Sequence, residues 1–160
     1  MQFPFEWPKT VMAEASAVIE QPAPQVFDFI GARFFDNYPK WDADVAKLEP
    51  LDGESVEAGV RGRQVRYDNG AMVESLFKVT EYQPHNCLVL EGLNAPYKQS
   101  YWLEAQSDKS TCLRFRFELL DLEMFMRPFE KLIRFAIQEG AENTVENIKQ
   151  LLAADAMLSA

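Results

Sequence analysis

One stretch near the C-terminus, PFEKLIRFAIQEGAENTVENIKQLLAADA from Pro128 to Ala156, decides the fold. It contains no proline after its first residue and a single glycine, Gly140, and its apolar residues recur three or four positions apart, which is the spacing of a helix. Proline fits the first turn of a helix, where its missing N–H is not needed. We therefore expect one long amphipathic helix, about 39 Å from Pro128 to Ala153 at about 1.5 Å per residue.

The same pattern predicts which side of this helix turns inward. The expected inner stripe is Phe129, Leu132, Ala136, Gly140, Asn143, Asn147 and Leu151, flanked by Ile133, Ile137, Ile148 and Leu152. Ala136, Gly140 and Asn143 are small or polar where a filled core would place Leu or Phe, and a glycine costs a helix about 1 kcal/mol relative to alanine. Two interpretations stay open: these residues leave room for a guest molecule, or Gly140 allows a close contact between helix and sheet.

Composition and charge limit the functions to consider. A chain of 160 residues suits a single domain, here residues 1–160, that buries its core without disulfides or metals. Its 12 Phe, 5 Tyr and 3 Trp residues predict a core or pocket lined with aromatic rings. The net charge of −9 repels phosphate backbones, so we expect no nucleic-acid partner.

The sequence also bears on location and redox state. Residues 1–10 are expected to form a loose segment, and they lack the basic start and continuous apolar run of a signal peptide. No window reaches 18 apolar residues, so we predict a cytoplasmic protein without an integral membrane segment. Cys87 and Cys112 have no metal-like spacing and are expected to be reduced strand residues.

The first part of the chain predicts one strand and two short helices. The strand, Val11 to Glu20, alternates in hydropathy and ends at a proline-rich turn. A first helix follows from Pro24 to Ile30, and a second runs from Arg33 to Tyr38 and ends before Pro39, because proline disfavours a helical residue ahead of it.

Six further strands are separated by turn signals. They are expected at Asp44–Leu51, Gly59–Tyr67, Ala71–Gln83, Cys87–Leu93, Tyr97–Gln106 and Thr111–Leu120. The Asn69-Gly70 pair between two of them is a strong hairpin signal, because a type I′ turn needs positive φ at both central residues. Short connections of this kind predict an antiparallel meander.

Alternation along the strands predicts which side chains face the helix. In Thr111–Leu120 the odd-numbered residues are apolar and the even-numbered ones mostly charged, so the odd-numbered set should face inward. The same argument places Val73, Ser75, Phe77 and Val79 inward, and Tyr101 rather than Trp102. Arg61, Arg63 and Arg66 follow one strand, and we expect them to form a solvated face.

Five segments resemble the START-like, or Bet v 1-like, superfamily (SRPBCC), and specifically its bacterial polyketide cyclase/dehydrase-like branch. They are QPAPQVFDF at 21–29, FDNYPKWD at 35–42, GVR at 59–61, VTEYQP at 79–84 and STCL at 110–113. The resemblance covers Val11 to Ala154, with Val60 and Cys112 standing where Thr and Arg are common.

This resemblance implies an α+β helix-grip fold. In that fold a curved seven-stranded antiparallel sheet wraps around a long C-terminal helix, and two short helices lie between the first and second strands. It also implies a deep apolar cavity between sheet and helix that holds a lipid, an aromatic compound or a polyketide-like molecule. A fold alone does not fix the function.

The residues themselves offer little catalytic chemistry. The one histidine, His85, lies in a predicted turn, which argues against a buried triad or a multi-histidine metal site. No phosphate-binding loop and no HExxH or GxSxG motif is present. We expect no cofactor and no metal, and the absence of motifs favours a non-enzymatic ligand-binding protein over an enzyme.

The expected ligand is a small hydrophobic molecule held between the sheet and the helix. The predicted ligand-binding residues are Trp41, Val73, Phe77, Gln99, Tyr101, Phe115, Phe129, Leu132, Ala136, Gly140 and Asn143. Among them Gln99 and Asn143 would orient the guest, because such pockets are mostly apolar with a few polar groups.

Two alternatives use the same fold. A polyketide cyclase, aromatase or dehydratase would need an ionisable group inside the cavity, for which Tyr101, Tyr67, Asp42 and Asp44 are candidates. A quinone-binding or protein-interaction carrier would use Trp102 or the apolar segment 122–126 as its contact, and that segment would otherwise be a flap, a dimer contact or buried core. The protein is expected to be a monomer or a homodimer.

Overall fold

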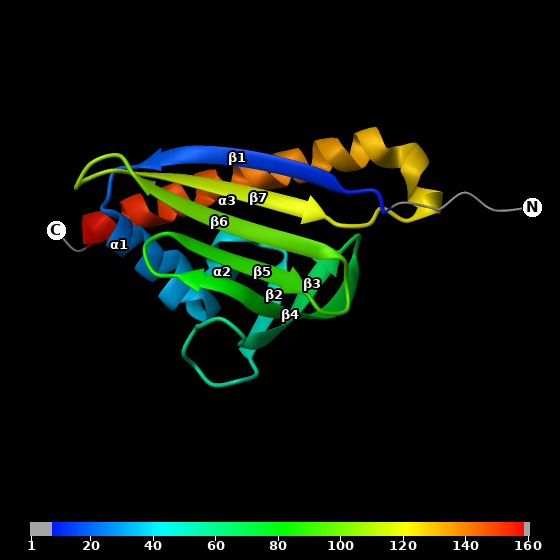
Figure 1. Ribbon diagram of the computed structural model, residues 1–160, viewed down its shortest axis with the longest axis horizontal. Helices are drawn as coiled ribbons and strands as arrows, with labels where there is room; N and C mark the ends of the chain where they lie inside the picture. The colour runs from blue at the N-terminus through cyan, green and yellow to red at the C-terminus, as the bar shows by residue number, and fades with distance from the viewer. Residues whose placement is uncertain (1–7, 159–160) are drawn as a thin grey trace, which may run out of the picture.

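The computed structural model describes residues 8–158, and these form one sheet, four short helical elements and one long helix (Figure 1). In chain order the elements are β1 (Val11–Ile19), α1 (Ala23–Phe27), the π-helical turn η1 (Asp28–Ala32), α2 (Phe34–Trp41), β2 (Val45–Pro50), β3 (Arg61–Asp68), β4 (Ala71–Gln83), β5 (Cys87–Gly92), β6 (Tyr97–Ala105), β7 (Thr111–Leu119), the 3-10 turn η2 (Met124–Phe129) and α3 (Glu130–Leu158). The loose segment expected over residues 1–10 lies, for residues 1–7, outside the described residues.

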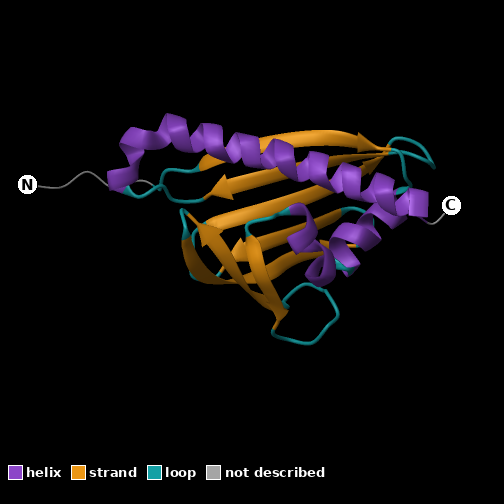
Figure 2. Ribbon diagram, turned by 180° about the vertical axis from the view of Figure 1, so that it is seen from behind, coloured by secondary structure: helices purple, strands orange, loops and turns teal. Residues whose placement is uncertain are grey.

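The seven strands form a single antiparallel sheet in the order β1-β7-β6-β5-β4-β3-β2. Consecutive strands from β2 to β7 are neighbours, and β1 closes the sheet against β7 over its whole length. Figure 2 shows α3 crossing one face of the curved sheet, with α1 and α2 beside its C-terminal part. The predicted helix-grip fold is confirmed.

The end predicted for the second short helix was wrong. The second short helix does not end before Pro39 but continues through it to Trp41. Proline lacks only its own N–H, and the following turn is closed by the N–H of Asp42, which donates to the carbonyl of Tyr38 at 3.1 Å. The extra turn brings Asp42 to the edge of the space between the sheet and α3.

The β3–β4 hairpin follows the sequence signal. Asn69 and Gly70 have φ of 50° and 81°, as the predicted type I′ turn requires. Further along the hairpin, Gly62 of β3 lies directly under the ring of Phe77 and beside that of Phe35, where a Cβ would collide with both. A glycine is needed there for close packing.

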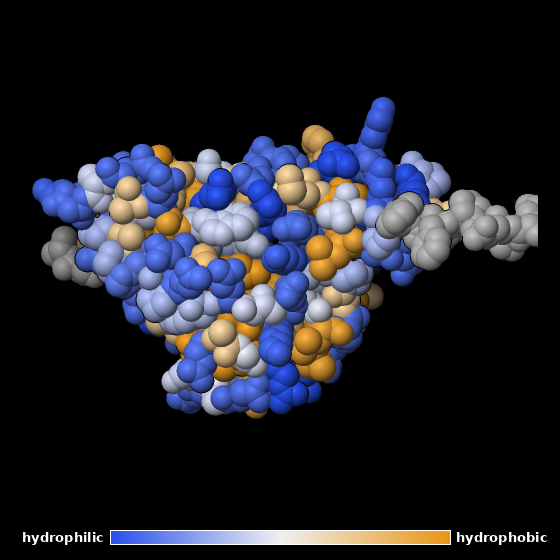
Figure 3. Space-filling view, in the orientation of Figure 1, coloured by the Kyte–Doolittle hydropathy of each residue, from blue (hydrophilic) through white to orange (hydrophobic). Residues whose placement is uncertain are grey.

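The strand faces predicted from alternation are also confirmed where they meet the core. Leu113, Phe115, Phe77 and Val79 are buried, and Tyr101 is buried whereas Trp102 is half-buried. On the opposite face Trp102 stacks with Arg114 and Arg116, whose guanidinium carbons lie 4.7 and 5.1 Å from its ring centre. Figure 3 shows that this outer face carries mainly polar side chains with isolated apolar patches.

The face of α3 that packs on the sheet differs from the predicted stripe. The buried residues are Ala141, Val145, Ile148 and Leu152, and Phe129, Leu132 and Asn143 are exposed. The helix is therefore rotated toward the residues expected to flank the stripe. Its first turns, with η2, extend beyond the ends of the strands (Figure 2), so their apolar residues have no sheet to face.

Among the described helices none is long and apolar enough to cross a membrane.

Candidate functional site

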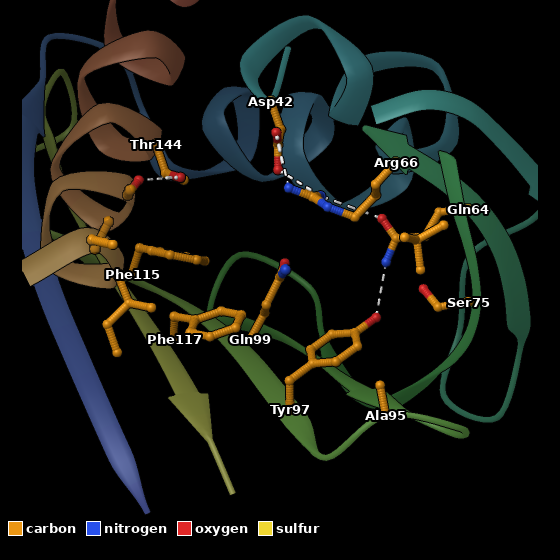
Figure 4. Close-up of a pocket in the computed structure, with 15 residues that line it drawn as sticks. Asp42, Gln64, Arg66, Ser75, Ala95, Tyr97, Gln99, Phe115, Phe117 and Thr144 are labelled. Carbon is orange, nitrogen blue, oxygen red and sulfur yellow. Dashed lines mark hydrogen bonds and ion pairs between the residues drawn. The ribbon is translucent and has the colours of Figure 1, made fainter. Parts of the chain in front are cut away.

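A pocket of about 380 Å³ lies between the sheet and the middle of α3 (Figure 4). It is lined by Asp42, Gln64, Arg66, Val73, Ser75, Ala95, Tyr97, Gln99, Phe115, Phe117, Ala136, Ile137, Gly140, Ala141 and Thr144. These come from the end of α2, from strands β3, β4, β6 and β7, from the β5–β6 turn and from α3. Ala136, Gly140 and Val73 are exposed, and we call the opening that they border the pocket mouth.

One wall of the pocket is apolar. Phe115 and Phe117 of β7 and Ile137 of α3 line it, and the ring of Tyr97 stacks on that of Phe117 with 6.1 Å between centroids. These side chains alternate inward along β7 and β6, so the same periodicity that builds the core builds the wall. The wall offers flat aromatic surface to a guest.

The other end of the pocket is polar and is organised around Arg66 of β3. Its Nη1 donates to the carboxylate Oδ2 of Asp42 at 2.9 Å and to the hydroxyl of Tyr38 at 3.2 Å. Both members of the ion pair are partly shielded from water. Because the two opposite charges lie together, the polar end carries little net charge although it contains an arginine.

Two amide side chains extend this network. Gln64 donates from Nε2 to the hydroxyl of Tyr97 at 2.9 Å, and Gln99 donates from Nε2 to the hydroxyl of Tyr38 at 3.3 Å. The hydroxyl of Tyr101 in turn donates to Oε1 of Gln99 at 3.3 Å. The side chains that line the polar end are thus held in place by one another (Figure 4).

The environment keeps the phenols of this network protonated at neutral pH. Burial, and next the Asp42 carboxylate, raise the pKa of Tyr38 far above its ordinary value. Burial also raises the pKa of Tyr97 and of Tyr101. For Arg66 burial acts to lower the pKa, but the neighbouring Tyr38 and Asp42 outweigh it and raise the pKa. None of the three tyrosines therefore serves as a base at neutral pH. Tyr97, which lines the pocket, can offer its hydroxyl to a guest as a hydrogen-bond donor.

Gly140 decides between the two interpretations of the middle of α3. No atom of a described residue lies within 4 Å of the place a Cβ would take, the adjacent backbone of the helix excepted. A close contact between helix and sheet is therefore not the reason for this glycine. Gly140 borders open space at the pocket mouth instead.

The structure gathers five of the eleven predicted ligand-binding residues around the pocket: Val73, Gln99, Phe115, Ala136 and Gly140. Trp41, Phe77 and Tyr101 lie instead in the core, where their rings pack against one another and against α2. They were expected at the wall because strand alternation gives the inward face but not the depth at which a pocket begins.

The remaining three predicted residues, Phe129, Leu132 and Asn143, lie on the exposed side of α3. The reason is the rotation of the helix described above, which turns Ile137, Ala141 and Thr144 toward the pocket in their place. Phe129 and Leu132 are exposed for a second reason as well, because this end of the helix extends beyond the ends of the strands.

The sequence analysis missed Arg66 as a pocket residue. It grouped Arg66 with Arg61 and Arg63, yet residues 61 and 63 share one face of β3 and residue 66 lies on the other, with Gln64. The alternation of odd and even positions along the strand was the signal that could have identified Arg66 and Gln64 as pocket residues. Tyr97 and Phe117 were likewise missed, although their odd numbers place them on the inward face of β6 and β7.

Outside the pocket the described residues offer little further chemistry. No group of three His, Cys, Asp or Glu side chains within residues 8–158 could hold a metal ion. His85 is exposed in the β4–β5 turn with a φ of 68°, and Cys87 and Cys112 are not joined in a disulfide. Asp44 and Tyr67, two of the candidates for proton transfer, are also exposed.

A protein-family comparison matches residues 10–153 to the family described as polyketide cyclase / dehydrase and lipid transport. The chain belongs to this family. The match spans every element from β1 to most of α3, including all residues that line the pocket. A search of the curated proteins finds no match.

Solved structures share the fold at low sequence identity. The protein TTHA0849 from Thermus thermophilus is 20% identical with a TM-score of 0.71, covering 89% of this chain and 98% of its own. The ZhuI aromatase/cyclase from Streptomyces sp. R1128 is 11% identical (TM-score 0.73, 89% and 93%). Norcoclaurine synthase from Thalictrum flavum is 12% identical (TM-score 0.70, 94% and 98%). At these identities the likeness establishes the architecture alone.

Proposed function

We propose that the protein binds a small, mainly apolar molecule in the pocket between the sheet and α3. The body of the guest lies against Phe115, Phe117 and Ile137, and a polar group of the guest meets Arg66, Gln64 and Gln99. A volume of about 380 Å³ is within the range of roughly 300–1,000 Å³ that small-molecule sites occupy. The cytoplasm as the place of action remains a prediction from the sequence.

The observation that carries the proposal is the open space over Gly140. A glycine inside a helix costs about 1 kcal/mol relative to alanine, and packing within the described residues gives no reason for it. Small residues at 136, 140 and 141 keep the mouth and the adjacent wall of the pocket unfilled. A guest would supply the contacts that the chain leaves unmade.

The test uses two substitutions at one position. Gly140→Phe places a ring in the pocket mouth, and Gly140→Ala adds only a methyl group and serves as the matched control. We expect the fluorescent aromatic probe N-phenyl-1-naphthylamine to bind the wild-type protein and Gly140→Ala alike, and to bind Gly140→Phe at least about tenfold more weakly, since one lost aromatic contact surface is worth more than about 1.4 kcal/mol. Equal binding by all three proteins would contradict the proposal.

Native mass spectrometry of the freshly purified protein addresses the natural guest. A bound small molecule, released on unfolding and absent from Gly140→Phe, would give its mass. If wild-type protein carries no such mass and takes up no probe, the pocket does not bind small apolar molecules.

A second candidate is catalysis of a cyclase, aromatase or dehydratase type in the same pocket. Its support is that ionisable side chains, Asp42 and Arg66, line the pocket rather than hydrocarbon alone. An acid–base role for Asp42 predicts that Asp42→Asn retains probe binding but fails to turn over any substrate that the wild-type protein converts. Equal conversion by both proteins would exclude that role.

A further inference from the structure

The charges at the polar end of the pocket balance one another. Among the described residues that line the pocket, only Asp42 and Arg66 carry a charge at neutral pH. A third titratable side chain, that of Tyr97, keeps its proton because burial raises its pKa. The exposed carboxylate of Asp44 lies nearby, with its Oδ2 4.0 Å from Nη2 of Arg66. An anionic group on a guest would therefore meet one cation and two carboxylates.

Asp42 engages both terminal nitrogens of the Arg66 guanidinium (Figure 4). Its Oδ2 accepts from Nη1 at 2.9 Å and its Oδ1 accepts from Nη2 at 3.4 Å. Paired N–H groups of this kind are what an arginine offers to a carboxylate. Nη1 also donates to the hydroxyl of Tyr38 at 3.2 Å and to Oε1 of Gln64 at 3.5 Å, so its two N–H groups already serve three acceptors. A guest carboxylate would have to compete with Asp42 for these nitrogens.

The Asp42 carboxylate is itself held in place. Its Oδ1 accepts the backbone N–H of Asp44 at 3.1 Å, and its Oδ2 accepts the hydroxyl of Tyr38 at 3.4 Å. Its side chain exposes only 22% of its surface, so water screens its charge less than that of a fully solvated carboxylate. Displacing Asp42 from Arg66 would break these hydrogen bonds as well as the ion pair.

The hydrogen-bond donors that remain for a guest suit an uncharged acceptor. The amide nitrogens of Gln64 and Gln99 each carry two N–H groups, and each uses one of them within the described residues. Their amide oxygens already accept hydrogen bonds, from Arg66 and from Tyr101 respectively. A ketone, ester or amide oxygen can accept from the free N–H groups without placing a second negative charge beside Asp42.

We propose that the pocket takes guests whose polar group is an uncharged hydrogen-bond acceptor and rejects the corresponding carboxylates, and that Asp42 sets this preference. The inference rests on the proposed function, because it concerns the guest of the same pocket. Asp42 acts as a built-in counter-ion, which keeps a cation stable at the end of an apolar pocket and withholds that cation from anionic guests. A guest carboxylate would lose its water without gaining a free partner, which is unfavourable. Asp42 is therefore a specificity-determining residue.

The experiment compares two probes of nearly the same shape, 2-acetylnaphthalene and 2-naphthoate, in which a methyl group replaces a charged oxygen. Isothermal titration calorimetry at neutral pH gives both dissociation constants. We expect the wild-type protein to bind 2-acetylnaphthalene at least about tenfold more tightly than 2-naphthoate. Because any apolar pocket disfavours a charge, the ratio of the two affinities is then compared among variants.

Asp42→Asn keeps the shape of the side chain and an acceptor for the N–H of Asp44, but it removes the charge and leaves Arg66 without its counter-ion. The ratio of affinities should shift at least about tenfold toward 2-naphthoate. Asp44→Asn is the matched control, since it removes the same charge from a side chain that is 69% exposed and farther from the guanidinium. It should shift the ratio less than about twofold.

A double variant shows whether Arg66 receives the anion. Adding Arg66→Gln to Asp42→Asn should abolish the gain in affinity for 2-naphthoate, because the cation is gone. Circular dichroism checks that each variant folds. The wild-type comparison needs no variant, so it tests the preference even if a substitution disturbs the fold.

Three results would overturn the inference: wild-type protein that binds 2-naphthoate as tightly as 2-acetylnaphthalene, an unchanged ratio in Asp42→Asn, or an equal shift in Asp44→Asn. The last result would assign the preference to net charge rather than to the pairing with Arg66. Failures of the two proposals are distinguishable. Binding of N-phenyl-1-naphthylamine without discrimination between the two naphthalene probes contradicts the specificity and leaves the binding function standing, whereas wild-type protein that binds none of the three probes contradicts both.

Discussion

The two halves of α3 belong to one helix and differ in almost everything else. From Ala141 onward the helix packs on the sheet, with Ile148 completely buried. Asn147 donates to the carbonyl of Trp41 at 3.1 Å, and the carbonyl of Leu152 accepts from Gln21 at 2.6 Å. From Glu130 to Phe135 the helix exposes its largest apolar side chains. The comparison teaches that helical periodicity reports apolar surface but not what covers that surface.

The largest expected effect tests the buried half. Ile148→Ala removes side-chain atoms from a fully enclosed position and leaves a cavity, so the free energy of unfolding should fall by about 2–5 kcal/mol. Urea denaturation followed by circular dichroism measures this. A loss below about 1 kcal/mol would mean that this half of the helix is not the anchor described above.

The next effect lies at the junction of the two halves. Gly140→Ala should raise the free energy of unfolding by about 0.5–1 kcal/mol, because alanine is the better helix former and the added methyl group meets no described neighbour. The shift of the thermal midpoint measures the gain. Destabilisation would instead point to a packing requirement at this position.

A smaller effect is expected in the exposed half. Leu132→Ala should change the free energy of unfolding by no more than about 0.5 kcal/mol, as for other surface substitutions, although it deletes as much side chain as a core substitution does. It is the direct counterpart of Ile148→Ala in the same denaturation assay. A cost like that of Ile148→Ala would show that Leu132 is covered in solution.

The smallest effect concerns pH. Hydrogen bonds from Lys9 and then from Arg134 lower the pKa of Glu130, so the folded state favours the carboxylate. The stabilisation is complete above the ordinary carboxyl pKa and is lost as the pH falls through the lowered one. Between about pH 5 and about pH 3, amide protection factors at 130–135 should drop relative to those at 145–152, and Glu130→Gln should abolish this difference. An unchanged ratio in the wild-type protein would contradict the pairing.

Much of the fold could be predicted because local signals agreed with one another. Asn69-Gly70 specified a hairpin, strand alternation specified the inner face of β7, and the long apolar repeat specified α3. Pro39 was misjudged because its effect on a helix depends on whether the chain closes the following turn, which Asp42 does.

The candidate site could be predicted only in part. Five pocket residues were predicted correctly, because a small side chain on the helix stripe or the alternation along a strand indicated them: Gly140, Ala136, Phe115, Gln99 and Val73. The rotation of α3 could not be predicted, since two apolar stripes compete along the helix and only its packing against the sheet decides between them. The polar end depends on a contact between Asp42 and Arg66, residues far apart in the chain, whose pairing no local pattern encodes.

The hydrogen-bonded set around Arg66 has one more consequence. Tyr38, Asp42, Gln64 and Gln99 already hold one another at 2.9–3.5 Å. A guest would therefore meet side chains whose rotamers are already fixed by folding. Binding would lose little further conformational entropy in ordering them. Such preorganisation favours a rigid guest with one suitably placed acceptor over a flexible one of equal size.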